Sequence, residues 1–423
     1  MSKERANDSL DQRKLRESVS LVWAYKMGQM VSLLIHVGDR LSLFGTLATL
    51  GKPVTANQLA AHTGMHRRWL MEWLRGMAAA KVLQYEEGTD ETETFLLSAE
   101  MEAVLSDAQN SLVYAAGAFG GMQQKELSDG LVHAFKTGVG MSYKARSLVL
   151  GDETAVGTKR LLGTWTRLAL VQHVLSALGG GLLTTQLERG GRVLDMGCGA
   201  GVAVNCLGAA FPNAQIHGVD PDGIALDVGR HDARSSGLPN VTFIESSGEE
   251  YAQHLSGQYD FAMCLDILHD CAFPDKVLAA LFRLLKPGGI LLVKDIKSTG
   301  SFPQDMKKIG TLAMLYGFSV SSCLSSALSE PGGMGLGTLG FNPAVARKLC
   351  SEAGFTEFTQ HDFRDPANLY YEMAKPDVCP GPGLRPSAAH SVDLSSMPAP
   401  AFCACHGGMV VPMSCLPLAT SRL

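Results

Sequence analysis

The chain has 423 residues, of which 46% are hydrophobic and 18% are charged, and its formal charge at neutral pH is −5. This composition excludes a disordered polymer, a collagen-like fibre and a small disulfide scaffold. The net negative charge argues against a protein that binds nucleic acid through many phosphate contacts. At roughly 100–200 residues per domain, the length suggests two or three domains.

The sequence offers no clear membrane or export signal. Even the stretch from Leu161 to Leu183 is interrupted by arginine, glutamine and histidine, so we expect no run of the ~18–20 apolar residues that span a bilayer. The first 18 residues carry charges of both signs and no apolar core, unlike a secretory signal. Ten cysteines extend from Cys198 to Cys415 without a C-x-x-C pair. We therefore expect a soluble, cytoplasmic protein with reduced thiols.

Residues 1–115 are expected to form a mainly helical domain that contains a winged helix. Apolar residues at three- and four-residue spacing predict a helix over Trp23 to Val37. The sequence Thr55-Ala-Asn-Gln58 is a capping box before a short helix, and a second helix is expected from His66 to Ala80. Two short apolar segments then flank the acidic turn at residues 86–93, as in a β-hairpin. A helix-turn-helix followed by a hairpin predicts a winged helix.

The rest of the chain divides into a helical connector at residues 116–185, an α/β domain at residues 186–376 and a tail at residues 377–423. In residues 186–376, short apolar strands alternate with amphipathic helices, which is typical of a doubly wound sheet. Seven strands are expected, at Arg192–Met196, Gln215–Val219, Val241–Glu245, Phe261–Leu265, Ile290–Asp295, Phe355–Asp362 and Leu369–Ala374. The last two predict an antiparallel hairpin that closes the sheet. The tail is rich in Pro, Ser, Ala, Gly and Cys, so we expect it to be unstructured.

A glycine-rich loop joins the first of these strands to a helix. It reads Arg192-Val-Leu-Asp195-Met-Gly197-Cys-Gly199-Ala-Gly201. Glycines at every second position let the backbone pass close to a ligand, and the helix N-terminus offers free N–H groups to an anionic part of it. Asp220 ends the next expected strand, where doubly wound folds bind ribose hydroxyls. Dinucleotide enzymes use G-x-G-x-x-G at this turn, whereas this loop reads D-x-G-x-G-x-G.

This loop resembles motif I of the class I S-adenosylmethionine-dependent methyltransferases, and Leu285-Lys-Pro-Gly-Gly289 resembles the turn before their fifth strand. The winged helix, the segment Ala134-Phe-Lys-Thr-Gly-Val-Gly and Leu268-His269-Asp270 extend the resemblance, over about residues 20–376, to small-molecule methyltransferases with an N-terminal winged-helix domain. It implies a seven-stranded, Rossmann-like methyltransferase sheet, S-adenosyl-L-methionine as cofactor and a small-molecule methyl acceptor. It also implies a homodimer joined through the N-terminal domain, with no metal, no nucleic-acid partner and no membrane partner.

The resemblance also assigns site residues. The cofactor is expected at Asp195, Gly197, Gly199, Gly201, Asp220, Ser247, Gly248 and Leu265. Among these, Ser247 stands where an acid usually meets the adenine amine. His269 matches the catalytic histidine of the related plant O-methyltransferases, with Cys271 in place of the tryptophan of their His-Asp-Trp motif, and Asp295 matches the acid that orients it. Tyr143 and His269 are expected at the substrate.

Several alternatives stay open at this point. The chain could instead be a transcription regulator that uses the winged helix on DNA and the α/β domain as a nucleotide sensor, although acids in the expected wing would repel phosphates. The acceptor atom could be O, N, S or C, and a thioether or carbon acceptor would need no base. Glu330 to Gly337 is either an active-site lid or a flexible connection. Cys403-Ala-Cys405-His406 is either a metal site or part of a solvated tail, and the tail reading is favoured.

Overall fold

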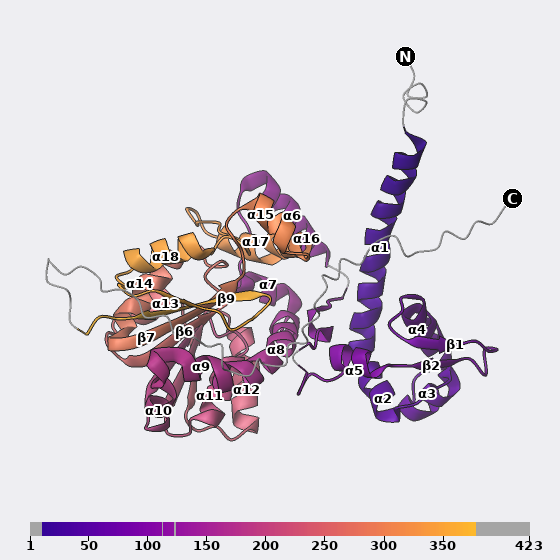
Figure 1. The fold of residues 1–423 in the computed structure, drawn as a ribbon, viewed down its shortest axis with the longest axis horizontal. Helices are drawn as coiled ribbons and strands as arrows, with labels where there is room; N and C mark the ends of the chain where they lie inside the picture. The colour runs from indigo at the N-terminus through magenta and orange to yellow at the C-terminus, as the bar shows by residue number, and fades with distance from the viewer. Residues whose placement is uncertain (1–10, 112, 122–123, 378–423) are drawn as a thin grey trace, which may run out of the picture. The chain divides into compact units, whose positions relative to one another are not determined.

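The computed structural model describes residues 11–111, 113–121 and 124–377, and it divides the chain into two compact units (Figure 1). The first unit contains the N-terminal residues as far as Gln124 together with Val156–Thr164. The second contains Lys125–Ala155 and the residues from Trp165 onward. Except for Asp377, the expected tail lies outside the described residues, and so does its Cys403-Ala-Cys405-His406 motif.

The first unit contains the expected winged helix. Its elements are α1 (Gln12–Arg40), α2 (Leu43–Leu50), α3 (Ala56–Thr63), α4 (Arg67–Ala79), β1 (Gln84–Glu86), β2 (Thr94–Leu96), α5 (Ala99–Leu105) and the 3₁₀ turn η2 (Ala116–Ala118). The capping box is present, because the Thr55 hydroxyl accepts from the Gln58 backbone and the Gln58 side chain accepts from the Thr55 backbone. The strands β1 and β2 pair antiparallel, as expected for the wing. Arg160 joins this unit from α8 (Glu153–Trp165) by binding the carboxylate of Asp39 and the hydroxyl of Tyr114.

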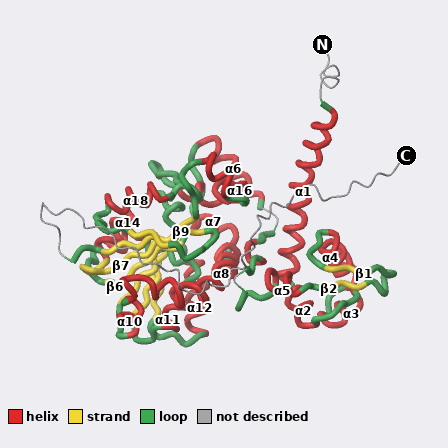
Figure 2. The backbone as a smooth tube through the Cα atoms, in the orientation of Figure 1, coloured by secondary structure: helices red, strands yellow, loops and turns green. Residues whose placement is uncertain are grey.

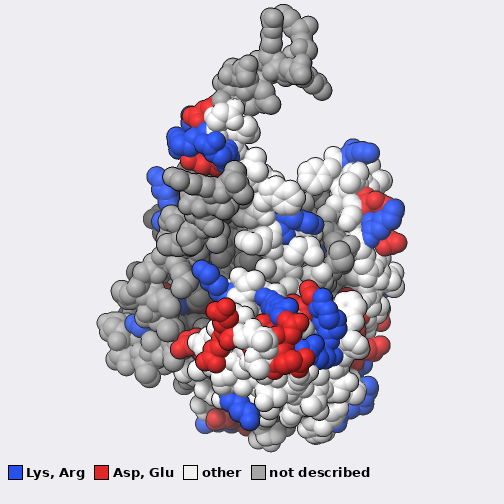
Figure 3. Space-filling model, turned by 90° about the vertical axis from the view of Figure 1, so that its right-hand side faces the viewer, with Lys and Arg blue, Asp and Glu red and all other residues white. Residues whose placement is uncertain are grey.

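The acids of the wing are paired with the arginines of α4. Arg75 binds Asp90 at 2.5 Å and Glu93 at 2.8 Å, and Arg67 binds Glu91 at 3.2 Å. On the face drawn in Figure 3, basic and acidic side chains lie intermixed and form no continuous basic patch. A helix that reads DNA presents its arginines to phosphates and bases, whereas these guanidinium groups are already neutralised by carboxylates.

Helix α1 is longer than the sequence predicts and more exposed. Asp11 caps it and accepts from the backbone of Arg13 and Lys14. Its first half carries exposed apolar side chains, with Trp23 67% and Met27 56% accessible. In length and composition α1 meets the criterion for a membrane-crossing helix, and no other helix among the described residues does. The expectation that no such run exists therefore needs correction. The winged-helix elements nevertheless hold its other end, where the Trp73 indole N–H donates to the Leu34 carbonyl.

The second unit is built on a seven-stranded sheet in the order β5-β4-β3-β6-β7-β9-β8. The strands are β3 (Arg192–Met196), β4 (Gln215–Asp220), β5 (Val241–Glu245), β6 (Tyr259–Leu265), β7 (Leu285–Ile296), β8 (Thr359–His361) and β9 (Asn368–Ala374). Strands β3 to β7 pair in parallel, and β9 is antiparallel to both of its neighbours. The doubly wound sheet and its closing hairpin are thus confirmed. The expected strand at residues 355–362 shortens to three residues, and β7 begins at Leu285, five residues earlier than expected.

Helices connect and cover these strands (Figure 2). Before β3 the chain forms α6 (Lys125–Thr137), α7 (Tyr143–Leu150), the π-helical η3 (Thr166–Val174), α9 (Leu175–Ala177), η4 (Leu178–Gly181) and α10 (Leu183–Glu188). Between the strands lie α11 (Val202–Ala210), α12 (Gly223–Ser235), α13 (Gly248–Ala252) and α14 (Pro274–Leu284). After β7 come α15 (Phe302–Lys308), α16 (Leu312–Phe318), the π-helical η5 (Ser319–Cys323), α17 (Leu324–Ala327) and α18 (Pro343–Glu352).

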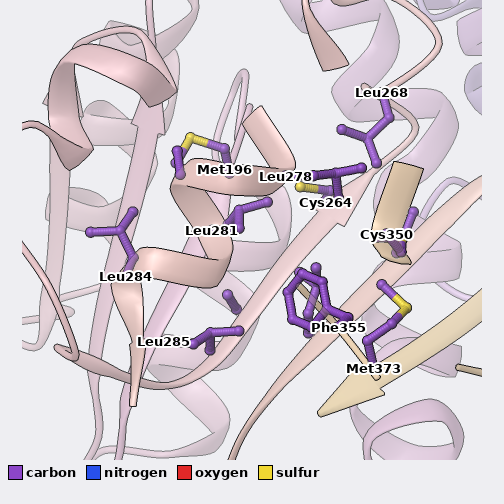
Figure 4. Packing of buried hydrophobic residues seen from close by; sticks show 14 of the residues in the cluster. Met196, Cys264, Leu268, Leu278, Leu281, Leu284, Leu285, Cys350, Phe355 and Met373 are labelled. Atoms are coloured by element: carbon purple, nitrogen blue, oxygen red, sulfur yellow. The ribbon is translucent and has the colours of Figure 1, made fainter. Parts of the chain in front are cut away.

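The sheet is buried on both faces, as its near-continuous apolar strands require. Along β6, Ala262 and Cys264 belong to one core cluster, whereas Phe261 and Met263 belong to the cluster on the opposite face. Figure 4 shows the first cluster, in which Cys264 and neighbouring apolar side chains from helices and strands fill the space above the sheet. Because both faces are closed, polar side chains of the strands gather at the ends of the sheet.

Candidate active site

The carboxyl ends of β4, β3, β6 and β7 lie along one edge of the sheet, because these strands pair in parallel. The loop after β3 touches the turn after β6, since a methyl group in place of the Gly197 hydrogen would lie 2.7 Å from Ile267 Cδ1. The glycine loop and the Leu268-His269-Asp270 segment therefore share one site. Ligands of open α/β sheets bind at this edge.

The three glycines of the loop have left-handed backbones but different surroundings. Their φ angles are +73° at Gly197, +50° at Gly199 and +68° at Gly201. A Cβ at Gly201 would lie 2.3 Å from the Phe243 ring, whereas a Cβ at Gly199 would meet nothing within 4 Å. Gly197 and Gly201 thus allow the loop to pack against its neighbours, and Gly199 leaves open space over the loop.

Asp220 ends β4 next to this loop. One carboxylate oxygen accepts from the Gly199 backbone N–H at 2.9 Å, and the other accepts from the Asp222 backbone N–H at 2.8 Å. Burial outweighs these two bonds and raises the pKa of Asp220 to about 6. Each oxygen keeps a further lone pair. Asp195, on the neighbouring strand, is buried, and burial together with the charge of Asp220 raises its pKa well above the usual value.

The remaining residues assigned to the cofactor surround the same loop. Ser247 caps α13, where its hydroxyl accepts from the Glu250 backbone at 3.2 Å. A methyl group on Gly248 would lie 3.0 Å from Met196 Sδ, so this glycine packs against the end of β3. Leu265 is the half-buried last residue of β6. The Ser247 hydroxyl is thus engaged as a helix cap and keeps its proton for one further bond.

His269 and Asp295 form a buried hydrogen-bonded pair. His269 lies in the turn after β6 and Asp295 near the end of β7, with 2.7 Å between His269 Nδ1 and Asp295 Oδ1. Their relative accessibilities are 3% and 1%. Burial opposes a charge on the imidazole, but Asp295 and then Asp270 outweigh it and raise the pKa of His269 well above its usual value. The arrangement fixes Nδ1 toward Asp295 and turns Nε2 away from it.

A buried ion pair shapes the turn that carries His269. Asp266 has a φ of +60°, unusual for a residue other than glycine. Its backbone N–H donates to the Lys294 carbonyl at 2.7 Å, and its carboxylate accepts from the Lys294 ammonium at 2.6 Å and from the Asn368 amide. The Lys294 ammonium also lies 4.3 Å from the Trp165 ring centroid. The sequence analysis missed this network, because its members come from four distant segments.

Three further side chains approach His269. Asp270 Oδ1 lies 3.2 Å from His269 Nε2, and the Cys323 thiol from η5 lies within hydrogen-bond reach of both residues. Tyr143 begins α7 and faces Asp270; burial and then the charge of Asp270 raise the pKa of its phenol well above the usual value. Tyr143 therefore lies beside Asp270, and its expected place at the substrate stays a prediction, whereas Cys323 was missed. Cys271, which stands where the related enzymes have tryptophan, is a thiol whose pKa burial and then Asp270 raise to about 12.

Helix α7 runs along the strand ends and is attached to them by three side chains of its first five residues. Tyr143 faces Asp270 after β6, and the Ser147 hydroxyl hydrogen-bonds the Asp222 carboxylate after β4. Between them, Lys144 binds Glu245 at the end of β5 at 3.2 Å. Helix α7 thus covers the edge at which the glycine loop lies.

The connection at residues 330–337 is exposed at residues 330–332 and at Met334, but contacts with neighbouring segments anchor it. The Met334 backbone N–H donates to the Ala272 carbonyl at 2.8 Å, close to the His269 turn, and Leu336 packs on the core cluster. Just before this connection, the Leu328 carbonyl accepts from the Gly140 backbone N–H at 3.0 Å. The connection therefore lies close to the turn that carries His269.

Two family models match the chain. Residues 187–336, which span β3 to β7, match a family described as a methyltransferase domain, and residues 29–107 match an Rv2258c-like winged HTH domain. The chain thus carries a methyltransferase domain that follows a winged-helix domain. The family and the winged-helix domain predicted from the sequence are thereby confirmed, and S-adenosylmethionine is the cofactor of this family.

Solved structures and curated proteins agree with this family. A putative O-methyltransferase from Nostoc punctiforme aligns with a TM-score of 0.60 at 17% identity, covering 87% of this chain and 100% of the other. Human N-acetylserotonin methyltransferase, solved with S-adenosylmethionine, aligns with a TM-score of 0.55 at 19% identity, covering 89% and 100%. The ubiquinone biosynthesis O-methyltransferase of Erwinia tasmaniensis is 36% identical over 100 residues, which is 24% of this chain and 40% of that protein. The chain thus spans less than half the length of this curated relative.

Proposed function

We propose that this methyltransferase transfers a methyl group from S-adenosylmethionine to a hydroxyl or amine of a small organic molecule. The hydrogen-bonded His269–Asp295 pair, set beside the glycine loop at one sheet edge, carries this proposal. The names of several similar proteins, which are O-methyltransferases, support a hydroxyl acceptor.

The residues of the loop fit the cofactor. The free lone pairs of Asp220 would accept the two ribose hydroxyls, and the open space over Gly199 would receive the nucleoside. The N-terminus of α11 offers a positive dipole end to a carboxylate. Ser247 would donate its hydroxyl proton near the adenine. When bound, S-adenosylmethionine supplies an electrophilic methyl group on its sulfonium.

We assign His269 as the general base and Asp295 as the residue that positions it. With the Nδ1 proton donated to Asp295, Nε2 presents a lone pair to the acceptor proton. The carboxylate stabilises the imidazolium that forms when the proton arrives. Because Asp295 and Asp270 raise the pKa of His269, the ring becomes available as a base only when the pH exceeds that raised pKa. Tyr143 and the turn bearing Asp270 border the place of the acceptor.

Calorimetry tests the cofactor assignment without knowledge of the acceptor. Asp220→Ala removes two bonds to a charged acceptor, each worth ~1.5–3 kcal/mol, so S-adenosylmethionine affinity should fall by at least ~100-fold. Asp227→Ala is the matched control, because Asp227 is an exposed acid on α12 paired only with Arg230 within the described residues. Unchanged affinity in Asp220→Ala, or a wild-type chain that binds NAD instead, would refute the assignment.

Turnover in a metabolite extract with a labelled methyl donor identifies the acceptor. Mass analysis of the product gives the acceptor atom. A methylated thioether would contradict the base role of His269, because such an acceptor has no proton to lose.

We further propose that the chain is a cytoplasmic homodimer joined through its first unit. The exposed apolar side chains of α1, among them Trp23 and Met27, support burial against a second copy. Light scattering that finds only monomer would contradict the dimer. The neutralised arginines of α4 argue against the alternative of a DNA-binding regulator, and a nanomolar, sequence-dependent gel shift would restore that alternative.

A further inference from the structure

Three potential metal ligands of different chemistry converge at the end of β6. The His269 ring nitrogen, a carboxylate oxygen of Asp270 and the Cys323 sulfur all lie within 4.8 Å of one another. His269 Nε2 and Asp270 Oδ1 are 3.2 Å apart, yet Oδ1 accepts no aligned hydrogen bond from any described residue. All three side chains are largely or fully shielded from solvent. Three ligand atoms that lie this close together, one of them a buried carboxylate oxygen without a hydrogen-bond partner, are arranged as a cation would require.

The backbone segments that carry these ligands are held in place. In the turn, the backbone N–H groups of Asp270 and Cys271 both donate to the Ile267 carbonyl. The helix that ends at Cys323 is held by the Arg146 guanidinium, which donates to the Ser321 carbonyl. One turn later, the Ser325 hydroxyl accepts from the Met141 backbone N–H. Because the backbone is held on both sides, we expect the three ligand atoms to approach a common metal ion by rotation of their side chains.

The outer contacts of His269 also match a metal-bound imidazole. A histidine that ligates zinc usually donates its other ring N–H to a carboxylate, which orients the ring and strengthens the ligand. Asp295 accepts from His269 Nδ1 at 2.7 Å and is itself fixed by the Ile296 backbone N–H at 2.7 Å. Nε2 is the free ligand atom, and it faces Asp270 and Cys323.

The mixture of nitrogen, oxygen and sulfur ligands selects the metal. Zinc takes imidazole, carboxylate and thiolate at ~2.0–2.3 Å, whereas Mg²⁺ and Ca²⁺ prefer oxygen alone. One thiolate and one carboxylate balance the two charges of Zn²⁺, so the buried site would be neutral. Three protein ligands leave a fourth tetrahedral position open.

We propose that His269, Asp270 and Cys323 form a Zn²⁺ site that competes with the base role of His269. Binding would release the Cys323 thiol proton and, where His269 is an imidazolium, its Nε2 proton to the buffer, and it would occupy the Nε2 lone pair. Zn²⁺ at low concentration would then inhibit methyl transfer. A zinc site differs from the sequence-based expectation of a site without metal. The inhibition rests on the proposed function, whereas metal binding can be measured without turnover.

The test uses Co²⁺ as a coloured substitute for Zn²⁺ in the full-length chain. Cys379, Cys403, Cys405 and Cys415 are first replaced by serine, so that cysteines beyond the described residues contribute no signal. We expect one equivalent of Co²⁺ to bind with a thiolate-to-cobalt charge-transfer band, and Zn²⁺ to displace it. In that background Cys323→Ser should abolish the band, and Asp270→Asn should weaken binding at least tenfold. Cys206→Ser, which changes a half-buried cysteine on α11, is the matched control and should change neither.

The results separate the two parts of the proposal. Absence of the band, or a band that survives Cys323→Ser, overturns the metal site. Circular dichroism and S-adenosylmethionine calorimetry on the same variants show whether they are folded and whether cofactor binding is intact. Metal binding with unchanged turnover at full Zn²⁺ occupancy overturns the competition with His269. The expected result is that Zn²⁺ no longer changes the turnover of Cys323→Ser, measured as the ratio of its rates with and without Zn²⁺.

Discussion

Replacing Asp220 with asparagine should remove a pH dependence from cofactor binding. Burial raises the pKa of Asp220 to about 6, whereas two ribose hydroxyls are bound best by the ionised carboxylate. At pH 5 only about one carboxylate in eleven would be ionised, so the apparent Kd for S-adenosylmethionine should be ~10-fold weaker than its plateau above pH 7. Asparagine keeps the shape of the side chain and does not titrate. Its affinity should be weaker than that of wild type at pH 7.5 and flat between pH 5 and 7.5.

Calorimetry of S-adenosylmethionine binding between pH 5 and 8 measures this effect, with Asp227→Asn as the control that keeps the wild-type profile. The stability of the cofactor-free protein should respond as well. Because the folded-state pKa is raised above its usual value of 3.8, the contribution of Asp220 to the free energy of unfolding is fully present below about pH 4 and is lost as the pH rises through about 6. A wild-type Kd that is equal at pH 5 and pH 7.5, or a pH dependence retained in Asp220→Asn, would refute the reasoning.

Four further predictions concern the loop and the base. His269→Gln should lower kcat by ~10²–10⁴-fold while S-adenosylmethionine affinity measured by calorimetry stays within a factor of two or so of wild type; near-normal kcat would end the base assignment. In wild type, kcat should fall as the pH is lowered, with an apparent pKa above 6.5, because the pKa of His269 is raised. Stopped assays at several pH values should find no such acid limb in His269→Gln. Asp295→Asn should lower kcat by less than His269→Gln does. It should also move the acid limb of kcat to lower pH, because the variant lacks the charge that favours the imidazolium. An acid limb that stays in place would contradict the pairing of His269 with Asp295. Gly201→Ala should lower the midpoint of thermal unfolding more than Gly199→Ala. Both changes cost ~1–2 kcal/mol in the left-handed region, but only Gly201→Ala forces a methyl group against Phe243. Equal midpoints would show that the loop adapts to the methyl group.

The sheet and its edge could be predicted because both depend on local patterns. Apolar strands of four to seven residues and glycine turns mark β3 to β6 within two residues of their observed bounds. Once those strands are parallel, the glycine loop, Asp220 and His269 must share an edge. The family resemblance added the pairing of His269 with Asp295, and the structure shows these side chains in contact.

Other features depend on information that the apolar pattern does not carry. The first turns of α1 are polar, so periodicity marks its beginning near Trp23 and not at Gln12, where Asp11 caps it. Cys323 lies 54 positions after His269, on a π-helical turn that shifts the phase of the helix, and a 3.6-residue period cannot place it. In contrast, the cap at Ser247 had a signal, because Ser-x-x-Glu at residues 247–250 is the pattern of a capping box.

The attachment of α7 along the strand ends has a consequence for the exchange of cofactor and product. A nucleoside bound over the glycine loop lies beneath a helix attached through Ser147 to Asp222 and through Lys144 to Glu245. Its departure would require these contacts to open, so they would slow the release of S-adenosylhomocysteine. The exposed Lys144–Glu245 pair weakens as ionic strength rises, and residence times should therefore shorten in salt while the equilibrium geometry of the loop is unchanged.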